Sequence, residues 1–153
     1  MLYSHWVAAD SIYATRRAAI SGEEKLAQQI GAEAVQAAKM LSAFYRMLVF
    51  YALVYVVVEA YRELDDRSDE LDRLLNEGPI DNLRRLRNAV FHVQDEPFTP
   101  KLWDFLHTPE SEKWIYRVHR GLEKFIRERL PIDATLAALR DQHDTLPPDE
   151  NGA

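Results

Sequence analysis

Residues 82–94 constrain the fold more than any other part of the chain, because their hydrophobic residues repeat at the spacing of an α-helix. On a helical wheel the apolar side chains Leu83, Leu86, Val90 and Val93 occupy one narrow sector. One face of this predicted helix therefore packs against a core. The rest of the wheel carries cations, an amide, an imidazole and one large aromatic residue: Arg84, Arg85, Arg87, Asn88, Phe91 and His92.

Helical patterns continue through the rest of the chain. Ser21-Gly22-Glu23-Glu24 has the form of a capping box, so a long helix is expected to begin there and to run to about residue 64, with Gly31 as a point where it could break. Thr-Pro pairs at 99–100 and 108–109 resemble an N-cap followed by proline in the first turn. The other helices are expected over residues 5–20, 68–76 (ended by Gly78-Pro79), 101–107, 109–130 and 132–140.

The absence of a strand pattern, an internal repeat or a glycine-rich phosphate loop leaves the all-α class. We expect an up-and-down helical bundle of about four to five main helices plus short ones, in a single domain over residues 1–140. Residues 141–153 are acidic, contain two prolines and have few apolar side chains, so they are predicted to be a disordered tail.

The apolar run at residues 47–58 lies between Arg46 and Glu59. Twelve residues are too few to span a bilayer, so the run indicates a buried core helix and no membrane partner. No basic segment of the secretory type opens the sequence. The chain has no cysteine, which excludes disulfides and thiolate metal sites and fits a cytoplasmic protein.

The net charge argues against binding of nucleic acid over the whole surface, but the distribution of charge allows a local basic patch. The net charge of the whole chain is −6. Residues 59–77 contain three basic and eight acidic side chains, whereas residues 80–130 contain ten basic and eight acidic ones. A polyanion would therefore meet the second half of the chain.

Arg87, Asn88 and His92 form the one constellation with an evident chemistry. No histidine pair or His/carboxylate spacing indicates a metal site, and no cofactor motif appears. Histidine exchanges protons near neutral pH, and the planar fork of arginine matches phosphoryl oxygens. A histidine and an arginine together suit metal-independent cleavage of RNA, in which the RNA's own 2′-hydroxyl attacks the phosphate. That reaction needs both an acid and a base, and two chains about a two-fold axis would supply two histidines.

The segment Arg87-Asn88-Ala89-Val90-Phe91-His92 resembles the R-x4–6-H motif of HEPN domains (higher eukaryotes and prokaryotes nucleotide-binding), many of which have Asn after the Arg. The resemblance implies an all-α bundle that forms homodimers, in which paired motifs make an endoribonuclease site. It also implies a toxin or defence role beside a nucleotidyltransferase-type antitoxin. Some members have Tyr two places after the His, where this chain has Gln94, so control by tyrosine modification is not implied.

Carried over, Arg87 and His92 would be catalytic and Asn88 would support them. Arg84 and Arg85 would attract phosphate, and Phe91 would lie at the dimer interface. On the late helix, Arg117, His119 and Arg120 either extend an RNA groove or form a solvated face.

Glu59 either orients Arg87 or forms an ion pair with Arg62 or Arg46. The sequence favours the ion pair with Arg62 or Arg46 over the orienting role. Two other functions remain open. One is a non-catalytic HEPN-like module that binds a nucleotide or a protein, and the other is a structural helical adaptor.

Overall fold

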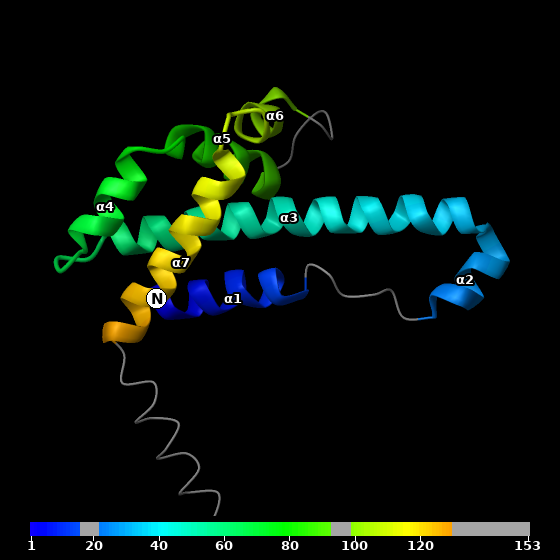
Figure 1. Cartoon of the computed structure of the whole chain (residues 1–153), viewed down its shortest axis with the longest axis horizontal. Coiled ribbons are helices and arrows are strands. Elements are labelled where there is room, and N and C mark those ends of the chain that lie inside the picture. Colours follow the sequence, from blue (N-terminus) through cyan, green and yellow to red (C-terminus); the bar gives the residue numbers. More distant parts are fainter. Residues whose placement is uncertain (16–21, 93–98, 130–153) are drawn as a thin grey trace, which may run out of the picture.

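A computed structural model of the chain describes residues 1–15, 22–92 and 99–129. These residues form seven α-helices and no strand (Figure 1). The predicted all-α helical bundle is therefore confirmed. The helices are α1 (Leu2–Thr15), α2 (Glu23–Ile30), α3 (Ala32–Arg62), α4 (Asp69–Asn76), α5 (Ile80–Phe91), α6 (Pro100–Leu106) and α7 (Ser111–Arg129).

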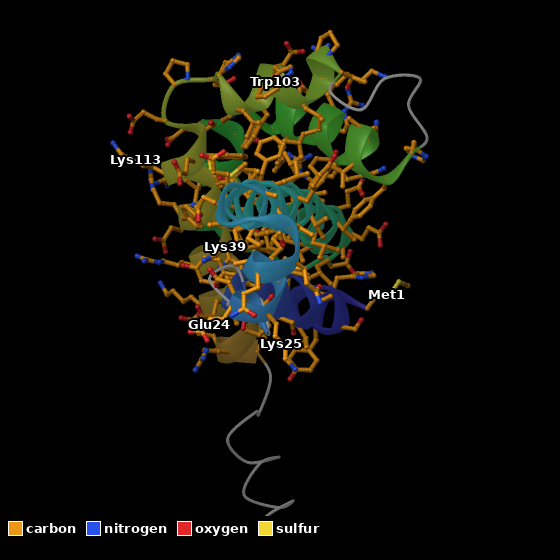
Figure 2. All side chains as sticks on the ribbon, turned by 90° about the vertical axis from the view of Figure 1, so that its right-hand side faces the viewer. Met1, Glu24, Lys25, Lys39, Trp103 and Lys113 are labelled. Carbon is orange, nitrogen blue, oxygen red and sulfur yellow. The ribbon has the colours of Figure 1, made fainter. Side chains whose placement is uncertain are left out.

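The long helix α3 is the axis about which the other helices are arranged (Figure 1). α1 runs antiparallel to it on one side, and α5 and α6 lie on the opposite side, while α7 crosses it steeply. Figure 2 looks along α3 from its α2 end and shows α1 below this helix and Trp103 of α6 above it. The covering helices gather over the C-terminal half of α3, whereas α2 accompanies its N-terminal end.

The helices that cover the C-terminal half of α3 explain why that half can be so apolar. Among the described residues, α3 alone is long and apolar enough by length and composition to cross a membrane, a test that the core helix of a soluble protein also passes. Its C-terminal half is such a core helix, as predicted for residues 47–58, and the fold is compatible with a soluble protein. A cytoplasmic location stays a prediction. The side chains buried there are Leu48, Phe50, Tyr51, Ala52, Val54, Tyr55, Val57, Val58 and Tyr61.

The long helix predicted from the capping box is two helices. Gly31 adopts φ 90° and ψ 149°, a backbone conformation open to glycine because it has no Cβ, and α3 starts at the next residue. The N-cap of α2 is Gly22 at φ 74° without a side-chain cap, so the prediction of a capping box from Ser21 was wrong in its cap residue. Ser21 itself and the predicted end of the first helix lie outside the described residues.

The predicted starts at Ser68 and at Thr99-Pro100 agree with the structure, whereas α1 begins at Leu2, before the predicted start at residue 5. Ser68 precedes α4, and its Oγ accepts a hydrogen bond from the Leu71 backbone N at 3.4 Å. Thr99 and Pro100 begin α6 as expected. Thr108, however, does not cap α7, which begins three residues later, because its hydroxyl donates to the Asp104 carbonyl at 2.7 Å and closes the end of α6. The helix predicted at 132–140 and the tail at 141–153 lie outside the described residues.

α5 has the two faces that the helical wheel predicts. Leu83 and Leu86 are fully buried, while Phe91 is 46% exposed. The helix ends at Phe91, earlier than the predicted end near Gln94, and His92 follows as an extended C-cap residue. Val93 and Gln94 lie outside the described residues. The packing of α5 against α3 positions the candidate site.

Candidate functional site

Arg87 reaches from α5 to α3 and is held there by three groups. Its Nη2 donates to both carboxylate oxygens of Glu59, at 2.6 and 2.5 Å, and its Nη1 donates to Oδ1 of Asn88 at 2.8 Å. The guanidinium carbon lies 5.3 Å from the centroid of the Tyr55 ring, within cation–π range. Since Tyr55 and Glu59 are four residues apart on α3, both face the same part of α5. The result is a guanidinium fixed in place.

Glu59 thus takes the role that the sequence favoured less. The sequence favoured an ion pair of Glu59 with Arg46 or Arg62, which lie nearer to it along the chain than Arg87 does. Instead, Arg46 Nη1 donates to the Thr15 carbonyl at 2.9 Å, and Arg62 has no ion-pair partner among the described residues. Packing of α3 against α5 overrides sequence proximity here, and it makes Glu59 the orienting partner of Arg87.

Asn88 connects the two residues of the motif. Its side-chain oxygen accepts from Arg87, and its backbone carbonyl accepts from the His92 backbone N at 3.1 Å, which closes the last turn of α5. The His92 side chain is exposed at the end of the helix. Arg87 is more enclosed, with a side chain 22% exposed, and its Nε is buried without a hydrogen-bond partner among the described residues.

Burial raises the pKa of Tyr55, and the Glu59 carboxylate raises it further, because a phenolate would be poorly solvated and would lie near a negative charge. Tyr55 therefore presents a neutral ring to Arg87. Sequence reasoning assigned Tyr55 to the core, where it is buried, and missed this contact. The spacing of Tyr55 and Glu59 on one helix face was the signal that could have revealed it.

The neighbouring arginines of α5 have looser partners. Arg84 lies 3.6 Å from Asp81 on the same helix, and Arg85 lies 2.8 Å from Asp104 on α6. All four side chains are at least one-third exposed, so solvent screens both pairs. Phosphate oxygens could replace these carboxylates at small cost.

The three residues predicted on the late helix do not share one environment. Arg117 and Arg120 are exposed and line a groove of about 580 Å³ between α4 and α7, whose lining includes no residue of α5. His119 is buried, only 4% exposed, between the rings of Tyr13 and Phe50. His119 is thus a core residue rather than part of a groove.

Phe91 is exposed at the end of α5, next to His92. Within the described residues, no three His, Asp or Glu side chains lie together in a way that could hold a metal ion. Comparisons with protein-family models, with curated proteins and with solved structures each returned no match.

Proposed function

We propose that the protein is a metal-independent endoribonuclease of the HEPN type, active as a homodimer. The observation that carries the proposal is the fixed guanidinium of Arg87, held by Glu59, Asn88 and Tyr55 beside an exposed histidine. A group that stabilises a transition state works best when it is oriented before the substrate arrives, because no reorganisation is then needed during the reaction.

In this mechanism one His92 acts as base and removes the proton of a ribose 2′-hydroxyl. The freed oxygen attacks the adjacent phosphorus, and Arg87 stabilises the charge on the pentacoordinate phosphate. The bond to the 5′-oxygen breaks, and the His92 of the second copy donates a proton to that oxygen. The products are a 2′,3′-cyclic phosphate and a free 5′-hydroxyl. Asn88 holds the motif together, and Arg84 and Arg85 attract the RNA backbone.

RNA and a second copy of the chain are therefore the proposed partners, and a nucleotidyltransferase-type antitoxin is the proposed regulator. A non-catalytic binding module is the second candidate, because Arg87 already has a carboxylate partner and needs no substrate to balance its charge. In such a module the Arg87–Glu59 pair would only tie α5 to α3.

Cleavage of a generic single-stranded RNA by the purified full chain tests the proposal. His92→Ala and Arg87→Ala should each slow cleavage by about 10²–10⁴-fold, since each removes a positioned catalytic group. Arg87→Lys should not restore activity, because an ammonium lacks the two-pronged contact. Arg127→Ala on α7 is the matched control and should cleave normally. Equal rates for all variants would exclude Arg87 and His92 as the site.

The same assay tests for a metal. Excess EDTA should leave the rate unchanged, because histidine and arginine supply the proton transfer and the charge stabilisation. Loss of cleavage in EDTA, with recovery on addition of Mg²⁺ or Mn²⁺, would contradict the mechanism.

A further inference from the structure

Two contacts between α4 and α7 mark the two ends of the groove between these helices. Near one end, Trp114 Nε1 donates to the Leu74 carbonyl at 2.8 Å, and near the other, Lys124 lies 3.3 Å from Glu70. The two helices are therefore antiparallel. Between these contacts lie Arg73 and Leu74 from α4 and Arg117, Arg120 and Gly121 from α7.

This middle part of the groove combines basic residues with apolar ones. Arg117 and Arg120 are one turn apart on α7 and so share a face, which the antiparallel register sets opposite Arg73. The apolar residues of the lining are Leu71, Leu74, Gly121 and Phe125. Gly121 lets the Leu71 side chain approach α7 closely, because a Cβ at this position would come within 3.0 Å of that side chain.

The three guanidiniums have no carboxylate partner among the described residues. Nine other lysine and arginine side chains of the described residues pair with a carboxylate. Three like charges around one groove repel each other, so a dianion placed between them would relieve that repulsion.

We infer that the middle of this groove binds the phosphoryl group of a small organic phosphate. Arg73, Arg117 and Arg120 contact the phosphate oxygens, for which their planar donors are well suited. Leu74 and Gly121 lie under the organic part of the ligand. The groove volume of about 580 Å³ falls in the range of small-molecule sites.

The carboxylates at the two ends of the groove favour a small ligand over a nucleic-acid strand. Glu77 lies beyond Leu74 at one end, and at the other Glu128 lies beyond the ion pair of Lys124 with Glu70. A phosphate backbone that continued past the arginines in either direction would meet negative charge, whereas a single phosphoryl group would not. Arg117 and Arg120 therefore bind this small ligand rather than extend an RNA site. The inference does not depend on the proposed endoribonuclease activity, with which it shares no residue.

Isothermal titration of the full chain with phenyl phosphate tests the inference, since this probe joins a phosphate dianion to an apolar ring. We expect saturable binding with a dissociation constant below about 1 mM. Arg73→Gln, Arg117→Gln and Arg120→Gln should each weaken binding by about tenfold or more, because each removes a charge-assisted contact. All three side chains are exposed, so melting temperatures should stay unchanged.

Arg127→Gln is the matched control, since Arg127 lies on the same helix, pairs with Glu123 and does not line the groove. It should bind phenyl phosphate like the parent chain. Absence of saturable binding, or binding that the three groove variants do not weaken, would overturn the inference. Equal affinity for inorganic phosphate would overturn the assignment of an organic ligand. Tighter binding of a short RNA that Arg117→Gln abolishes would show an RNA track instead.

Discussion

At the scale of single residues, Glu59 determines what Arg87 can do. The two side chains are 41% and 22% exposed, so water screens their attraction, and the pair contributes little to the stability of the fold. Its main effect is on geometry. Both carboxylate oxygens of Glu59 accept hydrogen bonds from Nη2 of Arg87, and Oδ1 of Asn88 accepts one from Nη1, so the guanidinium has one orientation. The Tyr55 ring lies against the face of this guanidinium. Glu59 is thus a positioning residue for the proposed reaction.

Glu59→Gln should slow RNA cleavage by about 10–100-fold, because a loosely held Arg87 no longer meets the developing phosphate charge in the right place. The free energy of unfolding should change by no more than about 1 kcal/mol. Cleavage assays and urea denaturation measure the two effects. Glu63→Gln, one turn further along the same chain, is the control and should alter neither. A large loss of stability with normal cleavage would mean that the pair is structural.

His119 is the residue whose protonation should affect the fold. It lies among the rings of Trp6, Tyr13 and Phe50, and its Nε2 has no hydrogen-bond partner among the described residues. Burial lowers its pKa from the ordinary value of 6.5, although Asp10, 3.6 Å away, opposes this shift. The unfolded chain therefore takes up the proton at a higher pH than the folded one.

Because of this difference, stability from His119 is fully present above about pH 6.5 and falls as the pH drops toward the lower pKa of the folded state. Chemical denaturation from pH 7.5 to 5 should show this fall. His119→Phe keeps an aromatic ring without a titrating group, so its stability should depend less on pH. His107→Phe, at an exposed histidine, should retain the parent profile. The same slope in His119→Phe would exclude His119 as the source.

At the scale of helices, the sequence predicts the position and the buried face of a helix but misses the contacts between helices. Periodicity located α5 and its two faces, because burial of Leu83 and Leu86 follows directly from helical spacing. The Arg87–Glu59 contact joins residues 28 positions apart, and only packing of α3 on α5 reveals it. Thr108 failed as a cap for the same reason, since its hydroxyl had a competing acceptor in α6.

The junction of α4 and α5 depends on a glycine that the sequence marks only as a turn. A Cβ at Gly78 would lie 1.9 Å from the Trp114 ring, which is buried and anchored to the Leu74 carbonyl. Gly78→Ala should therefore destabilise the fold by about 1–3 kcal/mol through overpacking. Urea denaturation measures this loss. The substitution should cost less in a Trp114→Phe background, and exposed Asn76→Ala should cost under about 0.5 kcal/mol. Equal stability of Gly78→Ala and the parent chain would contradict the packing.

At the scale of the whole molecule, large apolar side chains are exposed on several of the described helices, including α3 and α5. Phe91 is 46% exposed beside His92, and on the N-terminal half of α3, Met40 and Leu41 are 66% and 49% exposed. That half of α3 lies beyond the helices that cover the rest of it (Figure 1). Exposed apolar groups of this kind are typical of surfaces that meet a partner. The proposed reaction needs two histidines, and the chain offers one at its candidate site.

We therefore predict that the chain sediments at micromolar concentration as a dimer of twice 17.8 kDa. Phe91→Ser should shift it to a monomer and slow cleavage, because the second His92 would be lost together with the apolar contact. Met40→Ser is the matched control, since it removes a similarly exposed apolar side chain on the other surface. If Met40→Ser yields monomers and Phe91→Ser does not, the interface lies on α3 and the two His92 side chains are not brought together by Phe91. A parent chain that sediments only as a monomer would contradict a site shared between two copies.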